Sequence, residues 1–107
     1  MGESDPETAL MRWYACLEAG DSMAHFAVGY CLYDLGRYRE AYRHLRYYLE
    51  VSPNHPWNWC WFGKAAEAIG ELDEAQLAYE RAIELTDQGG DETAAPELLA
   101  AMSGDAR

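Results

Sequence analysis

The chain has 107 residues, half of them hydrophobic, and a formal net charge of −11 at pH 7. A composition this apolar argues against a disordered chain, and the length suits a single domain spanning residues 1–107. The negative charge disfavours nucleic acid and anionic membranes as partners, since both repel an acidic surface.

The N-terminal residues and the cysteines indicate the compartment. Residues 1–8, MGESDPET, lack the basic start and the apolar middle of a signal peptide, and no apolar run reaches membrane-spanning length. The three cysteines have no C-x-x-C spacing, so we interpret them as free thiols in a reducing compartment. We therefore expect a cytoplasmic protein.

The first predicted element is a helix over residues 7–19. Its apolar residues recur at helical spacing: Leu10, Trp13, Tyr14 and Leu17. Gly20 ends the pattern, so residues 7–21 are expected to form one helix and its terminating turn.

Residues 22–55 predict two helices, over 22–35 and 38–51. One apolar stripe leads to Gly36, and a second follows it from Tyr38 to Leu49. Glycine suits the junction because it readily takes the left-handed conformation that ends a helix.

Residues 56–89 predict two more helices, over 56–69 and 72–86, with a turn at Gly70. Pro56 suits the first turn of a helix, where its missing N–H group has no helical acceptor. The stretch PWNWCWFG (56–63) holds three of the chain's four tryptophans. Such a cluster is expected either in the core or at a binding surface.

Residues 91–107 allow two interpretations. The stretch TAAPELLAAM can form a short capping helix with Leu98, Leu99 and Met102 directed inward. A flexible tail is the alternative, because terminal segments fray readily.

The two middle segments repeat with a period of 34 residues. Three pairs of small residues share this spacing: Gly29 and Gly63, Gly36 and Gly70, and Ala41 and Ala75. Small residues at fixed positions of a helical pair are expected where two helices approach each other closely.

This pattern resembles the tetratricopeptide repeat (TPR) family, whose motif combines W-x₂-L-G-x₂-Y, A-x₃-F and a closing proline. The residues that match it are Gly29, Ala41 and Pro53 in the first repeat, and Trp59, Gly63, Ala75 and Tyr79 in the second. His25 replaces the motif's aromatic residue, and Asp87 replaces the second closing proline. The resemblance implies an all-α solenoid of helical hairpins with about two full repeats, 22–55 and 56–89, preceded by half a repeat in 7–21.

The resemblance also implies a concave groove lined by the first helix of each repeat. The residues aligned with that groove are Met23, Phe26, Tyr30, Tyr33, Trp57, Cys60, Trp61 and Lys64. Trp59 is expected in the core between the two helices of its repeat. Two hypotheses for the groove remain open: it binds a peptide segment, or it is covered by this chain's own helices or by a second copy.

A basic stripe lies outside the predicted groove. Arg39, Arg43 and Arg46 share one face of the predicted 38–51 helix. A solvated face and a docking patch for an acidic partner or a second copy are both consistent with it.

The sequence contains no motif for a catalytic triad, a phosphate-binding loop or a metal site. We therefore predict no enzyme, cofactor or metal. The leading hypothesis is an adaptor or chaperone-like module that binds a peptide of a partner protein. The alternative is a structural assembly protein whose apolar groove is buried in its own homo-oligomer.

Overall fold

Six α-helices follow one another in the computed structural model, which describes residues 6–21 and 24–104. They are α1 (Pro6–Glu18), α2 (Ala24–Asp34), α3 (Tyr38–Val51), α4 (Pro56–Ala68), α5 (Leu72–Asp87) and α6 (Ala95–Gly104). No strand occurs within these described ranges. The prediction of an all-α protein is confirmed, and the bounds of the first five helices lie within two residues of those predicted.

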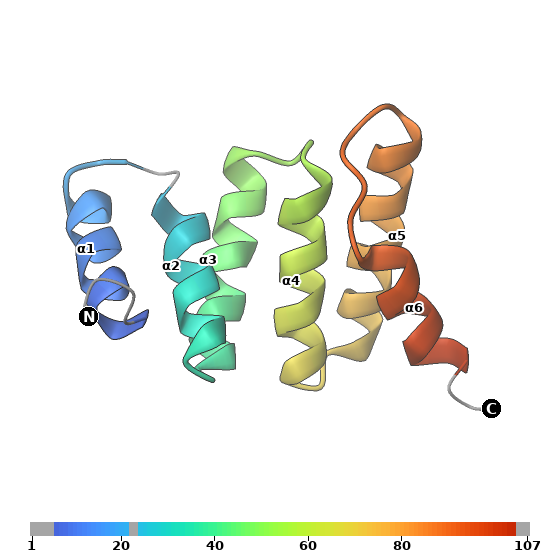
Figure 1. The fold of residues 1–107 in the computed structure, drawn as a ribbon, viewed down its shortest axis with the longest axis horizontal. Coiled ribbons are helices and arrows are strands. Elements are labelled where there is room, and N and C mark those ends of the chain that lie inside the picture. The colour runs from blue at the N-terminus through green and yellow to red at the C-terminus, as the bar shows by residue number, and fades with distance from the viewer. Residues whose placement is uncertain (1–5, 22–23, 105–107) are drawn as a thin grey trace.

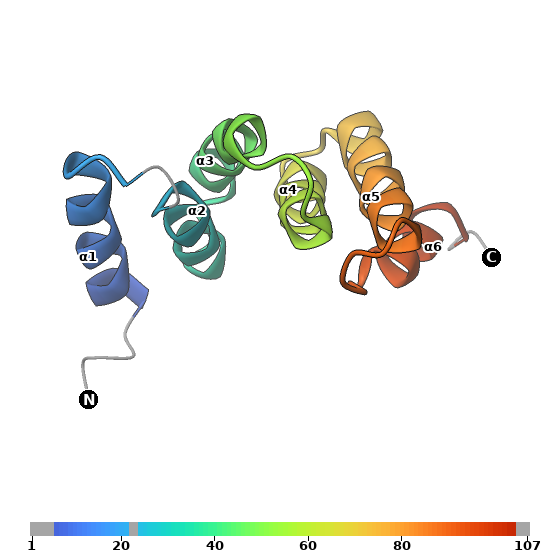
Figure 2. The same cartoon turned by 90° about the horizontal axis from the view of Figure 1, so that it is seen from above.

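The helices stand in a row in chain order, and each packs against the next (Figure 1). Seen from above, α2, α4 and α6 lie toward one side of the row, and α3 and α5 lie toward the other (Figure 2). The molecule is elongated, with principal extents of 42 × 28 × 24 Å. Because α2 also contacts α4 directly, these two helices present one shared face.

In each of the two hairpins, a glycine ends the first helix. Gly36 has a φ of +81° and Gly70 a φ of +87°. The following residue closes the turn in both cases: Arg37 N–H donates to the Leu32 carbonyl at 2.8 Å, and Glu71 N–H donates to the Ala66 carbonyl at 2.9 Å. These hydrogen bonds satisfy carbonyl groups that would otherwise lack a partner at the helix end.

Two other glycines allow the helices of each hairpin to approach. A Cβ atom on Gly29 would lie 2.6 Å from Cγ of Leu45, and one on Gly63 would lie 2.6 Å from Cε1 of Tyr79. Both distances are shorter than any ordinary carbon–carbon contact. The 34-residue spacing of these glycines therefore reflects the same close packing in both hairpins.

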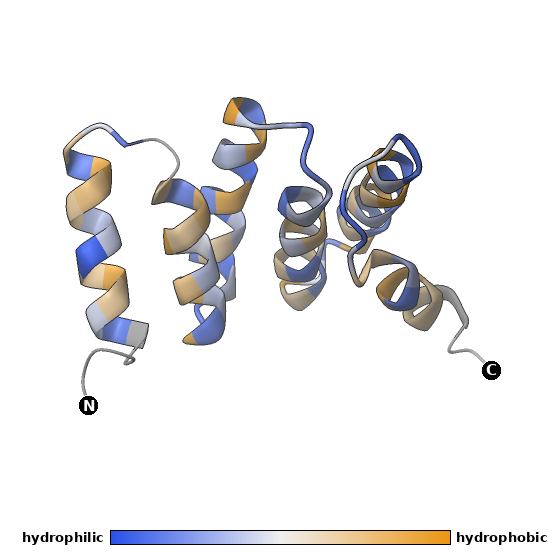
Figure 3. Ribbon diagram, turned by 45° about the horizontal axis from the view of Figure 1, so that its top comes forward, coloured by the Kyte–Doolittle hydropathy of each residue, from blue (hydrophilic) through white to orange (hydrophobic). Residues whose placement is uncertain are grey.

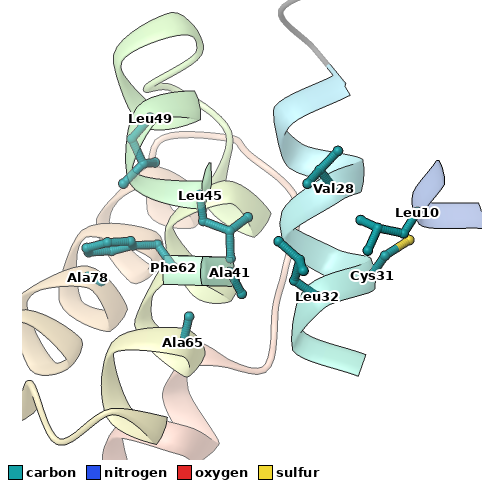
Figure 4. Packing of buried hydrophobic residues seen from close by; sticks show 10 residues of the cluster. All are labelled: Leu10, Val28, Cys31, Leu32, Ala41, Leu45, Leu49, Phe62, Ala65 and Ala78. Atoms are coloured by element: carbon teal, nitrogen blue, oxygen red, sulfur yellow. The ribbon is translucent and has the colours of Figure 1, made fainter. Parts of the chain in front are cut away.

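Apolar and polar residues are interspersed along α1, α3, α4 and α5, as expected for helices buried on one side (Figure 3). One core cluster runs from α1 to α5 and contains Leu10, Val28, Cys31, Leu32, Ala41, Leu45, Leu49, Phe62, Ala65 and Ala78 (Figure 4). A second joins α4, α5 and α6 through Cys60, Ala66, Ala75, Tyr79, Ala82 and Ala95. The helix α6 thus covers apolar surface that α4 and α5 would otherwise expose.

The start of α4 is tied to the preceding turn by two side chains. Asn58 Nδ2 donates to the Ser52 carbonyl at 2.9 Å, and Trp59 Nε1 donates to the Pro53 carbonyl at 2.7 Å. Asn58 is almost fully buried, so this hydrogen bond offsets the cost of removing its amide from water. The two bonds orient the tryptophan-rich first turns of α4.

Candidate functional site

Three aromatic rings meet on the face shared by α2 and α4. The Trp61 ring of α4 contacts Tyr30 and Tyr33 of α2 edge-on, with centroid distances of 4.9 Å and 5.4 Å. Edge-to-face packing is the favourable geometry for such rings. We refer to Tyr30, Tyr33 and Trp61 as the aromatic cluster.

Lys64 adds a positive charge to the aromatic cluster. Its Nζ lies 4.0 Å from the Trp61 ring centroid and 5.4 Å from that of Tyr33. Both are cation–π distances. Within residues 6–21 and 24–104, Lys64 forms no ion pair, so its ammonium group can still accept an anionic partner.

A hollow of about 420 Å³ lies beside the cluster and is lined by Tyr33, Lys64, Glu67, Ala68, Tyr79 and Leu98. The Tyr79 hydroxyl donates to Oε1 of Glu67 at 2.8 Å. Burial raises the pKa of Tyr79 strongly, and burial also raises the pKa of Tyr33. Both hydroxyl groups therefore stay protonated at neutral pH, and the hollow combines an apolar wall with a carboxylate and an ammonium group.

The other residues expected in the groove occupy different environments. Trp57 is 39% exposed and lies one helical turn before Trp61, so it extends the same side of α4. Tyr30 is 44% exposed, whereas Phe26 is half-buried against the Tyr48 ring at 5.8 Å. Met23 lies outside the described residues.

Cys60 does not lie on this surface. It is 0% exposed and belongs to the core cluster that contains Ala95 of α6. Burial raises the pKa of its thiol. The expectation that Cys60 lines the groove therefore needs correction, because the start of α6 covers this position.

The comparison with known proteins decides the family. A family model described as tetratricopeptide repeat matches residues 32–103. The chain belongs to the tetratricopeptide repeat family. It is also 30% identical over 78 residues to the TPR repeat-containing protein PA0015 of Pseudomonas aeruginosa, and the match covers 73% of this chain and 74% of that protein.

TPR repeats are in general protein–protein interaction modules and form a non-catalytic repeat family. In the repeats expected over residues 22–55 and 56–89, α2 and α4 are the first helices and α3 and α5 are the second helices. The aromatic cluster therefore lies on these two helices.

Trp59 packs against both core clusters but is less enclosed than expected. It is only half-buried, although it packs edge-on against Phe62 at a centroid distance of 6.5 Å. It lines a second hollow of about 370 Å³, together with Arg46, Leu49, Glu50, Phe62, Glu74, Leu77 and Ala78. We call this hollow the α3–α5 furrow, after the two TPR second helices that flank it.

A histidine pair also escaped the sequence interpretation. Nδ1 of His25 lies 3.0 Å from Nδ1 of His44, so one ring donates and the other accepts. Burial lowers the pKa of both imidazoles, and for His44 the neighbouring His25 lowers it further. The two residues are 19 positions apart and have no metal-site spacing, so only the three-dimensional packing of the TPR hairpin brings them together.

The described residues contain no group of three or more His, Cys, Asp or Glu side chains that could hold a metal ion. None of the described helices is both long enough and apolar enough to cross a membrane.

Proposed function

We propose that this TPR protein binds a peptide segment of a partner protein on the shared face of α2 and α4, and so acts as an adaptor or chaperone-like module. The packed aromatic cluster carries this proposal. Tyrosine and tryptophan give large contact areas at a low cost in conformational entropy, and they are enriched among the residues that dominate binding energy. Tyr30 and Trp57 are already exposed on this face.

The side chains on this face indicate which residues the bound peptide should contain. An apolar or aromatic anchor residue would pack against Trp61 and Tyr30, which already contact each other at a right angle. Lys64 would receive a carboxylate near that anchor, because the aromatic rings hold its ammonium group in place. The preferred peptide therefore combines an apolar residue with an acidic residue or a free C-terminus.

The compartment is part of the same proposal. Cys31 and Cys60 are buried free thiols, and Cys16 is a partly exposed one. Free thiols persist in a reducing environment, which supports a cytoplasmic site of action.

Peptide selection tests this proposal. Phage-displayed random peptides are selected on the immobilised protein, and the affinity of a selected peptide is then measured by isothermal titration calorimetry. We expect Trp61→Ala to weaken binding by roughly 30-fold or more, as for an interface residue worth about 2 kcal/mol. Met11→Ala is the matched control, because Met11 is 73% exposed on α1, away from the face.

Two results would contradict the proposal. The first is a peptide that binds Trp61→Ala and Tyr30→Ala as tightly as the parent. The second is loss of oligomers, rather than of peptide binding, in these two variants. That outcome would favour the alternative, in which the groove of a structural assembly protein is buried in its own homo-oligomer.

A further inference from the structure

The α3–α5 furrow has an apolar floor and charged edges. Leu49, Trp59, Phe62 and Ala78 form the floor, and α4 contributes the two aromatic rings. Leu77 stands at the edge and is 65% exposed, an unusually open position for a leucine. The furrow lies among the second helices of the repeats, so it is separate from the aromatic cluster on α2 and α4.

The first repeat shows that the fold does not require this hollow. In the first repeat, 34 residues earlier, His44 corresponds to Ala78 and His25 corresponds to Trp59. There the His25 and His44 rings pack 5.2 Å apart, and Tyr14 of α1 lies against His44 at 6.1 Å. Imidazole rings thus fill the space between α1 and α3, whereas the methyl group of Ala78 leaves the second furrow open.

The two helices that flank the furrow differ in net charge: α3 carries three arginines and two glutamates, and α5 carries five acidic residues and one arginine. On α3, Arg39, Arg43 and Arg46 are exposed on one side of the helix, and Arg46 lines the furrow together with Glu50. Of these, Arg46 donates to the Tyr42 hydroxyl, and none forms an ion pair among the described residues. An exposed basic stripe is exceptional on a chain whose net charge is −11.

The exposed side of α5 is acidic. Glu74 lines the furrow, whereas Glu80 and Glu84 follow Leu77 by three and seven residues on the outer side of the helix, where Glu80 also lines the hollow against α6. Among the described residues, Glu80 accepts a hydrogen bond from the exposed Gln76, and Glu84 pairs with the half-buried Arg81. Exposed interactions of this kind are weak and are easily exchanged for others.

These features make the surface complementary to itself. We infer that a second copy of this chain docks on the α3–α5 furrow through a two-fold axis, with α3 of one copy facing α5 of the other. Each Leu77 then enters the hollow of the partner copy, and each basic α3 faces an acidic α5. In a two-fold interface the same patch of both copies meets, so one patch must contain each side chain and also the site that receives it. The furrow contains both the exposed Leu77 and the hollow that would receive it. The inference concerns a face that the proposed peptide site does not use.

The test begins with molar mass in solution. Sedimentation velocity and light scattering, run from low micromolar to several hundred micromolar protein, should show a mass rising toward twice the 12.1 kDa of the chain. Leu77→Asp should raise the dimer dissociation constant at least about tenfold, because it places a charge in an apolar hollow. Met11→Asp is the matched control: Met11 is 73% exposed on α1 and does not line the furrow.

Charge reversal tests the geometry of the contact. Arg43→Glu/Arg46→Glu should dimerise poorly, and so should Glu80→Lys/Glu84→Lys, because each places like charges across the interface. Mixing the two variants should restore a dimer that contains one chain of each. All four side chains are exposed, so folding should be retained, and circular dichroism melts check this.

The outcomes separate the explanations. A wild-type protein that stays monomeric over the whole concentration range overturns the inference. It is also overturned by a dimer that persists in Leu77→Asp, or by charge-reversed variants that fail to associate when mixed. A dimer lost in Tyr30→Ala instead would assign self-association to the α2–α4 face.

Discussion

Adding a single methyl group at Gly63 tests the close packing within the second hairpin. A Cβ atom there would lie 2.6 Å from Cε1, 2.8 Å from Cδ1 and 3.2 Å from Cζ of Tyr79. The ring cannot easily move away, because Tyr79 is 0% exposed and its hydroxyl is bonded to Glu67. Gly63→Ala must therefore separate α4 from α5 or displace the ring.

Two opposing effects set the magnitude. Alanine in place of glycine inside a helix normally stabilises by about 1 kcal/mol. Overpacking a well-packed core costs about 1–3 kcal/mol. Since three ring atoms lie within 3.2 Å, the second effect should win. We expect Gly63→Ala to lower the free energy of unfolding by about 1–2 kcal/mol, and Gly63→Leu to lower it further.

The test depends on whether Gly63→Ala lowers or raises the free energy of unfolding. Denaturant unfolding followed by circular dichroism gives the free energy of each variant. Ala15→Gly is the control for helix propensity alone, because Ala15 is exposed on α1. If Gly63→Ala is as stable as the parent, or more stable, then Gly63 and Tyr79 do not meet as described.

Three further predictions concern other parts of the chain. Gly70→Ala should cost about 1–2 kcal/mol in the same assay, because the φ of +87° is strained for any residue with a Cβ atom, whereas no neighbouring atom lies within reach of the added methyl. Burial lowers the pKa of His25 and His44 in the folded protein below the ordinary value of 6.5. The unfolded chain therefore takes up protons first as the pH falls below 6.5. The free energy of unfolding should be highest above that pH and decrease below it. The double variant His25→Phe/His44→Phe should lose less stability on acidification, and equal losses would refute the assignment. In the native protein, Cys16 should react with a thiol reagent faster than the buried Cys60, whose thiol pKa is raised, and equal native rates would contradict the burial of Cys60.

The repeat architecture was predictable because its signals are local. The positive φ at Gly36 and Gly70 and the close approach at Gly29 and Gly63 each depend on one residue type at one position. A 34-residue period therefore predicted where the helices begin and end. The alignment placed Tyr30 and Trp61 on first helices, but it predicted neither their contact nor the position of Lys64 over the Trp61 ring.

Other features depend on how distant elements pack. The helix α6 begins at Ala95, five residues later than a 34-residue period would place it after Pro56, so the alignment gave no position for its contact with Cys60. Trp59 was expected in the core, and its half-burial depends on Ala78, which leaves the furrow open. A comparison of each residue with its equivalent 34 positions away would have shown that a histidine, His44, in the first repeat corresponds to a smaller alanine, Ala78, in the second.

The four tryptophan side chains allow the most direct test of the proposed binding face. Their indole N–H groups give separate signals in a ¹H–¹⁵N NMR spectrum, assigned with single Trp→Phe variants. A peptide selected on the protein should shift the signals of Trp57 and Trp61, while those of Trp13 on α1 and Trp59 in the α3–α5 furrow stay in place. A spectrum in which Trp59 responds and Trp57 and Trp61 do not would contradict peptide binding on the face of α2 and α4.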